Sequence, residues 1–439
     1  MVRKKILSLI LMVGVVGGIS AYAINYHNSS MQNIKVMAYK PSAQTNEKGY
    51  QIDKYQNIES AAWINDNEVL TLTKKGEFKT PDSMVPINYC SIYNLNTKSS
   101  KDFKEVNIDE FMGVSPDKKY VLYSEARTIP KCESPEWQKA LDSGELLHKN
   151  VKLLNLSTGE ITNVNTERLN SDAQFIWISK NKILANYFEK WAIIDTTGKV
   201  YANGSYNAGK FDNARISGVD DIKDLGTTVE GKFYYTQSKS GKEGVKLCTA
   251  DVKTKETKTI FSNQYAGMAD KKSKTIIIDH FNNNGEQSPD GVFVNRTFGA
   301  IIMDETGKQL QDIKLPKGKI NNTYVVSPDG SKVAYEEGVN HDGHTPPDPD
   351  TSIKIIDTKT GAIKEIVNGT SLKDKDAKIE YRTFHYIDKN GKYVKKKIPV
   401  CIAISNICWD STSTALSFTY GNYRSGNSEI NTYIVSLDK

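Results

Sequence analysis

The chain has 439 residues, of which 25% are charged and 38% hydrophobic, and its formal net charge is +6. Its 58 lysines and arginines nearly balance its 52 aspartates and glutamates, which excludes the strongly basic surface that nucleic-acid binding requires. Five scattered cysteines exclude a disulfide-based scaffold and match no zinc spacing, although Cys401 and Cys408 are close enough in sequence to be considered for a bridge.

Residues 1–23 have the pattern of an export signal. Arg3, Lys4 and Lys5 precede an apolar run, and Ala21-Tyr22-Ala23 is a small-x-small cleavage motif. The apolar residues 6–24 approach the roughly 20 residues that span a bilayer, so an uncleaved membrane anchor is the alternative. Both interpretations place the rest of the chain outside the cytoplasm, either secreted or held at the outer face of the cytoplasmic membrane.

The segment 24–56 precedes the repeated part of the chain. Within it, Ile34–Tyr39 alternates apolar and polar residues with period two, which predicts a half-buried strand.

From residue 57 to 439 a polar turn followed by two β-type runs recurs seven times, which predicts one all-β domain. The clearest copies begin with Ser115-Pro116-Asp117 and Ser327-Pro328-Asp329-Gly330. Self-similarity with an all-strand unit of about 40 to 50 residues is typical of a β-propeller blade. The predicted strands are 61–63, 68–72, 91–95, 113–114, 120–123, 151–156, 175–178, 182–187, 191–195, 232–236, 245–251, 274–278, 300–304, 332–335, 353–357, 362–366, 407–409, 415–420 and 432–437.

The seventh unit lacks a fourth strand, and the early strand Ile34–Tyr39 is predicted to supply it. Pairing between the two ends of the chain would remove exposed strand edges. We therefore predict a seven-bladed propeller closed by an N-terminal strand that pairs with the last blade. Six blades with a separate terminal hairpin is the alternative.

The repeat resembles the TolB-type, WD40-like propeller repeats of bacterial envelope proteins. Ser327-Pro328-Asp329-Gly330 followed by Asp357-Thr358-Lys359-Thr360-Gly361 is the best match, and Ser115-Pro116-Asp117-Lys118 with Ser157-Thr158-Gly159 is the second. The aromatic residue that usually precedes Ser-Pro is Val114 or Val326 here. The resemblance implies the fold, export and partner binding, and it carries no catalytic residue across.

An insertion at 127–150 contains Pro135–Leu141, which we predict to be a short helix. Trp137 and Leu141 are four residues apart and would share one helix face. They either pack on their own propeller or contact a partner.

A second insertion, 338–350, gathers two of the six histidines with three aspartates. Imidazole and carboxylate groups can bind a transition metal, but the spacing matches no zinc signature, and a solvated turn has the same composition. The candidate metal ligands are His341, Asp342, His344, Asp348 and Asp350.

A third insertion, 368–399, mixes aromatic and basic residues. Asn390-Gly391 predicts a hairpin with solvent-facing lysines, while the composition also suits a polyanionic glycan or a membrane surface. The candidate partner-binding residues here are Tyr381, Phe384, Tyr386, Tyr393, Lys395, Lys396 and Lys397.

The sequence contains no nucleophile elbow, phosphate-binding loop or dinucleotide fingerprint, so no catalytic residue and no cofactor is predicted. The chain is predicted to be a monomeric, exported, non-catalytic binding or scaffolding propeller of the bacterial envelope. Its partner would be an envelope protein or a cell-wall component, with membrane association through residues 6–24. The alternatives are a propeller hydrolase or lyase acting on a glycan or peptide, and a membrane-tethered sensor.

Overall fold

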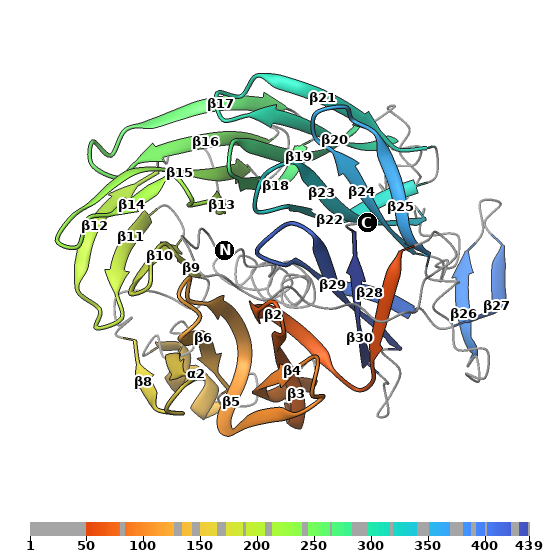
Figure 1. The fold of residues 1–439 in the computed structure, drawn as a ribbon, viewed down its shortest axis with the longest axis horizontal. Helices are drawn as coiled ribbons and strands as arrows, with labels where there is room; N and C mark the ends of the chain where they lie inside the picture. The colour runs from red at the N-terminus through yellow and green to blue at the C-terminus, as the bar shows by residue number, and fades with distance from the viewer. Residues whose placement is uncertain are drawn as a thin grey trace. The chain divides into compact units, whose positions relative to one another are not determined.

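The structure is a computed structural model, and almost all of its regular elements are β-strands (Figure 1). It describes residues 50–79, 84–126, 134–142, 150–164, 173–187, 190–206, 213–238, 245–263, 266–282, 297–316, 319–339, 351–368, 381–387, 392–399, 402–422 and 430–437. The chain divides into two compact units, which are described separately below. Unit 1 comprises the described residues among 60–206 and 222–230, and unit 2 those among 39–59, 207–221 and 231–439.

Unit 1 contains two antiparallel sheets. The first has seven strands in sequence order: β2 (Glu59–Asn65), β3 (Glu68–Lys79), β4 (Met84–Asn94), β5 (Ser100–Val114), β6 (Tyr120–Glu125), β7 (Val151–Asn155) and β8 (Ile161–Asn163). The second has four: β9 (Gln174–Trp177), β10 (Lys182–Tyr187), β11 (Lys190–Asp195) and β12 (Val200–Ser205). Helix α2 (Pro135–Asp142) lies in the insertion between β6 and β7, and the short β14 (Ile222–Asp224) also belongs to this unit.

Unit 2 contains four sheets with at least four strands each and one hairpin. The first sheet orders β13 (Asn213–Gly218), β15 (Val229–Ser238), β16 (Val245–Asp251) and β17 (Thr257–Asn263). The second orders β18 (Ala266–Lys272), β19 (Thr275–Asn282), β20 (Thr297–Asp304) and β21 (Gln309–Lys314). The third orders β22 (Lys319–Val326), β23 (Lys332–Val339), β24 (Ser352–Asp357) and β25 (Ile363–Asn368).

The fourth sheet joins strands from opposite ends of the sequence. Its order is β1 (Gln51–Tyr55), β30 (Ile430–Ser436), β29 (Ala415–Asn422) and β28 (Ile402–Trp409). The remaining strands, β26 (Tyr381–Ile387) and β27 (Tyr393–Pro399), form a separate two-stranded sheet.

Within unit 2, successive sheets stack by their faces because alternate residues of a strand point to opposite sides. Ile276 and Ile278 of β19 pack against Tyr234 and Leu247 of the preceding sheet. The intervening Ile277 instead packs into the core shared with the following sheet. The near-continuous aliphatic runs that predicted these strands thus serve two cores at once.

The same stacking occurs in unit 1, where Leu122 and Leu153 of the first sheet pack against Phe175 and Ile183 of the second. Meandering four-stranded antiparallel sheets that stack face to face are the repeating element of a β-propeller. The fold class is therefore all-β and of the propeller type, as predicted. The number of blades and the closure of a ring stay predictions.

The fourth strand of the last sheet is β1, whose residues pair antiparallel with β30 from Gln51↔Ser436 to Tyr55↔Thr432. The sequence predicted Ile34–Tyr39 for this position, and that segment lies outside the described residues. The sequence pattern of β1 itself is weak, because four of its five residues are only half-buried. Two further bonds support the junction, Asn57 N–H to Asn431 Oδ1 (3.1 Å) and Thr432 Oγ1–H to the Ile58 carbonyl (2.6 Å).

Candidate functional site

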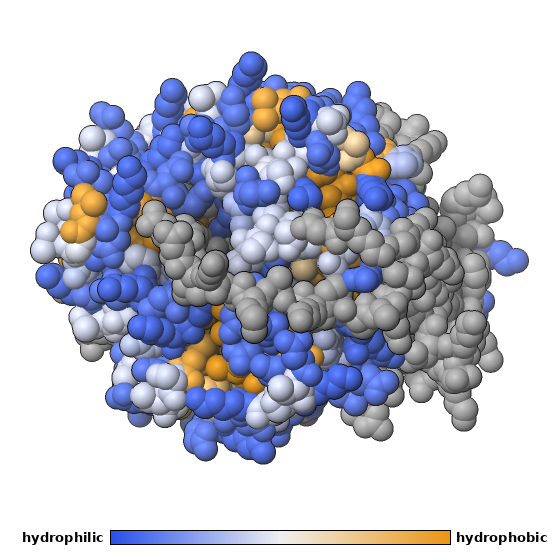
Figure 2. Space-filling view, viewed as in Figure 1, coloured by the Kyte–Doolittle hydropathy of each residue, from blue (hydrophilic) through white to orange (hydrophobic). Residues whose placement is uncertain are grey.

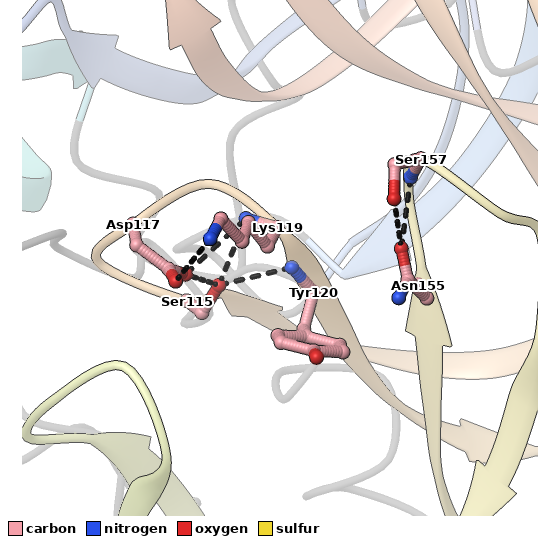
Figure 3. Close-up of polar contacts among 6 residues, drawn as sticks. All are labelled: Ser115, Asp117, Lys119, Tyr120, Asn155 and Ser157. Atoms are coloured by element: carbon pink, nitrogen blue, oxygen red, sulfur yellow. Dashed lines mark hydrogen bonds and ion pairs between the residues drawn. The ribbon is translucent and has the colours of Figure 1, made fainter.

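The Ser-Pro-Asp turns of the repeat use their polar groups to hold the backbone (Figure 3). In the turn between β5 and β6, Ser115 Oγ–H donates to Asp117 Oδ1 at 2.7 Å and accepts from Tyr120 N–H at 2.9 Å. The turn between β22 and β23 repeats this arrangement with Ser327, Asp329 and Lys332 N–H at 2.6 and 2.9 Å. Gly330 adopts φ +76° in this turn, a backbone region that favours glycine.

A second set of turns places an Asp or Asn at the end of an inner strand of a sheet. Asp357 Oδ1 accepts hydrogen bonds from Lys359 N–H (3.1 Å), Thr360 N–H (2.7 Å) and the Thr360 hydroxyl (2.8 Å). This is an Asx-type turn in which a side chain caps the following backbone amides. The same role falls to Asn94, Asn155, Asp195, Asp251 and Asp304.

These hydrogen bonds stabilise the ionised carboxylates. The Thr254 N–H lowers the pKa of Asp251, and the Thr360 N–H lowers that of Asp357. For Asp195, burial favours a higher pKa, but the bonds from Thr197 and Lys199 outweigh it and the pKa is lowered. These carboxylates accept hydrogen bonds from the turn amides and thereby stabilise the turns.

A polar surface cavity of about 190 Å³ lies in unit 1 beside these turns. Tyr120 and Asn155, both drawn in Figure 3, belong to its wall. The other lining residues are Leu153, Glu160, Thr162, Lys180, Asn181 and Thr196. Such a lining, with Glu160 as its single carboxylate, could hydrogen-bond a small polar molecule.

Lys182 and Lys271 are buried and form ion pairs with acidic residues. In unit 1, Lys182 is 1% exposed, forms an ion pair with Asp224 and donates to the Gly226 carbonyl at 2.9 Å. Its ammonium also lies 4.4 Å from the centre of the Tyr201 ring. Burial favours a higher pKa for Asp224, but the bonds from Lys182 and Ser179 outweigh it and the pKa is lowered.

In unit 2, Lys271 is 0% exposed and contacts Asp220 at 3.0 Å and Asp221 at 2.8 Å. Its ammonium lies 4.8 Å from the centre of the Tyr234 ring. Because each buried lysine has its charge neutralised by a close carboxylate, both clusters fasten neighbouring segments within their unit. Sequence analysis missed them, since a lysine beside a turn has the pattern of a solvated side chain.

A third cluster in unit 2 combines tyrosines with a buried carboxylate. Lys354 Nζ lies 2.7 Å from Glu337 Oε1, and Tyr335 Oη–H donates to Glu337 Oε2 at 3.4 Å. Burial, followed by the Glu337 charge, raises the pKa of Tyr335, and burial raises that of Tyr324. Both phenols therefore stay protonated at neutral pH.

The predicted metal ligands His341, Asp342, His344, Asp348 and Asp350 all lie outside the described residues. Among the residues that the structure does describe, no group of three His, Cys, Asp or Glu side chains could hold a metal ion. The metal site stays a prediction.

The predicted helix at 135–141 is present as α2 (Pro135–Asp142). It contains Trp137 and Leu141, whose side chains are not among those described, so their partner contact stays a prediction. No helix in the described part of the chain is long and apolar enough to cross a membrane. Residues 6–24 lie outside that part.

The predicted hairpin at the third insertion is also present, and we call β26 with β27 the basic hairpin. Its strands pair from Tyr381↔Pro399 to Ile387↔Tyr393. The predicted turn residues Asn390 and Gly391 lie outside the described residues. Phe384 pairs with Lys396, Thr383 with Lys397 and Tyr386 with Val394. The side chains of Lys392, Tyr393 and Lys395 are exposed. The structure thus brings the predicted aromatic and basic residues onto one two-stranded ribbon.

Comparison with known proteins gives no assignment from sequence. No protein-family model matches the chain. No curated protein matches it either.

Comparison with solved structures finds propeller proteins at low identity. The β-propeller domain of the Trilobed protease from Pyrococcus furiosus has 11% identity and a TM-score of 0.48, covering 88% of this chain and 99% of that one. TolB from Acinetobacter baumannii has 12% identity and a TM-score of 0.36, covering 94% and 87%. A prolyl endopeptidase matches with 11% identity and a TM-score of 0.45 over 85% of this chain, which spans about half (47%) of that protein's length.

These similarities are too weak to transfer a residue or an activity. The stacked antiparallel sheets define the chain as an all-β protein of the propeller type. Within that class, the basic hairpin is a described element that the four-stranded repeat does not require.

Proposed function

We propose that the chain is an exported, non-catalytic propeller that binds a protein or cell-wall partner in the bacterial envelope. The basic hairpin is the observation that carries the proposal. It is inserted between the last strand of one sheet, β25, and the first strand of the next, β28, and it pairs with neither. An added ribbon with exposed Tyr393 and Lys395 suits recognition, because loops on a rigid scaffold are the usual place of binding residues.

Export is part of the proposal and rests on the N-terminal sequence. A basic start, an apolar run and Ala21-Tyr22-Ala23 form the expected order of a signal peptide. N-terminal sequencing of the protein from its own cells tests it, and a mature chain beginning at Ile24 is the expected result. A retained first segment in the membrane fraction would instead favour the tethered sensor.

Photo-crosslinking in living cells tests the binding role. A photoreactive residue replaces Tyr393 in the hairpin, and a matched variant carries it at the exposed Lys258 of β17. We expect mass spectrometry to find one reproducible envelope partner attached at position 393 and absent at position 258. Recovery of no envelope component from position 393, in a folded and abundant protein, would contradict the binding role.

The second candidate is a propeller hydrolase or lyase that acts on a glycan or peptide. Two places favour it, the polar cavity in unit 1 and the 338–350 loop with His341 and His344. The metal-dependent version requires stoichiometric divalent metal in the purified protein and its loss in the His341→Ala/His344→Ala double variant. A folded protein that retains no metal after purification without chelator would exclude that version.

A further inference from the structure

The positive charge of the chain is concentrated in the basic hairpin. Residues 381–399 contain six basic side chains and one acidic side chain, Asp388. Of the formal net charge of +6, Arg3, Lys4 and Lys5 contribute three positive charges and the hairpin contributes five, so the remainder is weakly acidic at −2. The hairpin is therefore a local basic feature on an otherwise slightly acidic chain.

Its described side chains combine exposed charge with an exposed aromatic ring. Tyr393 is 60% exposed, the highest value among the large hydrophobic side chains that the structure describes as exposed. Lys395 is also exposed and lies two positions further along β27, so both side chains project from the same face of the strand. Lys392, the exposed residue directly before β27, adds a second charge beside the ring.

The form of the hairpin suits an extended surface better than a small ligand. It is a two-stranded ribbon separate from the four-stranded sheets, and in Figure 1 β26 and β27 stand apart from β22–β25 of the same unit. The cavity described above is lined by unit 1 residues alone. A ribbon that presents charge and an aromatic ring can lie against a flat anionic layer.

We infer that the basic hairpin binds the anionic phospholipid headgroups of a membrane surface. Five of its six basic residues are lysines, whose compact charge on a flexible stem suits a diffuse anionic layer, whereas bidentate recognition of one phosphate favours arginine. Tyrosine is enriched at membrane interfaces, where its ring is apolar and its hydroxyl stays hydrated. The inference rests on the proposed export, which brings the hairpin to the outer face of a membrane.

Hydrogen–deuterium exchange of the full chain with lipid vesicles tests the inference. Vesicles of phosphatidylglycerol and phosphatidylcholine are expected to slow amide exchange in β26 and β27, and pure phosphatidylcholine vesicles are not. About 1 M NaCl should abolish the effect, because the Debye length then falls to about 3 Å. This readout reports the hairpin itself even if residues 6–24 also insert into the vesicles.

Matched variants distinguish the effect of the hairpin's lysines from the effect of exposed lysines elsewhere in the same unit. Lys392→Gln/Lys395→Gln is expected to weaken anionic vesicle binding about thirtyfold, from the usual contribution of a lysine near an anionic leaflet. The control Lys255→Gln/Lys258→Gln removes two exposed charges from the same unit and should leave binding unchanged. Tyr393→Ser should weaken binding several-fold without changing its salt dependence, since it removes interfacial burial and no charge.

The inference is overturned if anionic vesicles leave exchange in β26 and β27 unchanged, or if both double variants weaken binding equally. Protection by a soluble polyanionic glycan such as polygalacturonate, without protection by vesicles, would assign the hairpin to a glycan. The in-cell crosslink at position 393 is a separate readout. A protein partner found there without vesicle binding would leave the binding role intact and remove only the lipid inference.

Discussion

Several carboxylates of this protein accept hydrogen bonds from backbone amides. These bonds make the stability of the fold sensitive to acid. Asp329 is the clearest example. Burial favours a higher pKa, but hydrogen bonds from Ser327 and Ser331 outweigh it and lower the pKa to about 2. A group whose pKa is lower in the folded chain stabilises the fold above its unfolded pKa, and that stability is lost as the pH falls toward the folded value.

We therefore predict that Asp329→Asn changes how the free energy of unfolding depends on pH in acid. Between about pH 4, the ordinary value, and about pH 2, the wild type should lose more unfolding free energy than the variant. Chemical denaturation at a series of pH values measures the difference. Parallel curves for the two proteins across this window would show that Asp329 is not responsible.

A second prediction concerns two glycines of unit 1. A Cβ atom at Gly204 of β12 would lie 2.6 Å from Cζ2 of Trp191, which is 0% exposed, whereas a Cβ at Gly76 of β3 would meet nothing within 4 Å. Gly204→Ala should destabilise the protein by about 1 to 3 kcal/mol through overpacking, and Gly76→Ala should be nearly neutral. Thermal unfolding of both variants checks this, and equal midpoints would contradict it.

At the scale of elements, sequence patterns located the inner strands and missed several outer ones. Ile276-Ile277-Ile278 and Val333-Ala334-Tyr335 are recognisable because both faces of those strands are buried. The outer strands β12, β17 and β21 have the sequences VYANGS, TKTIFSN and QLQDIK, because nearly all of their residues are exposed or only partly buried. The face in Figure 2 is accordingly mostly hydrophilic, with scattered hydrophobic residues.

Sequence patterns likewise predicted one part of the candidate site, the basic hairpin, and missed another, the buried lysine pairs. Asn390-Gly391 located the basic hairpin, because this dipeptide specifies a turn by itself. The buried Lys182 and Lys271 were not predictable, since their partners Asp224 and Asp221 come from segments 40 to 50 residues away, as the separations of 42 and 50 show. Sequence spacing alone gives no sign of such tertiary pairs.

The Lys182–Asp224 pair leads to a prediction about the β10 and β14 elements. Asp224→Asn leaves the buried ammonium without its counter-charge and should cost about 3 kcal/mol or more. The double variant Lys182→Met/Asp224→Leu removes both charges and should recover part of that loss. A double-mutant cycle by chemical denaturation measures the coupling, and purely additive effects would refute the role of the pair.

At the scale of the whole molecule, the pairing of β1 with β30 ties the first described strand to the last. Replacing Gln51–Tyr55 by an equal number of glycines and serines should expose the edge of β30, destabilise unit 2 and promote association between chains. The same replacement over Ile34–Tyr39 is the comparison. Unfolding midpoints and sedimentation of both variants show which segment pairs with the edge of β30. A loss of stability confined to the 34–39 variant would contradict the assignment to β1.

The β1–β30 pairing also sets the order in which the protein can assemble. The ribosome makes β1 among the first strands, yet its partner follows far later, as the 374-residue separation of the adjoining Asn57 and Asn431 shows. Loop closure over such a distance is entropically costly and slow. Until residue 430 has been made, the strand edge that β1 would cover is unpaired and open to any strand-binding chaperone or protease.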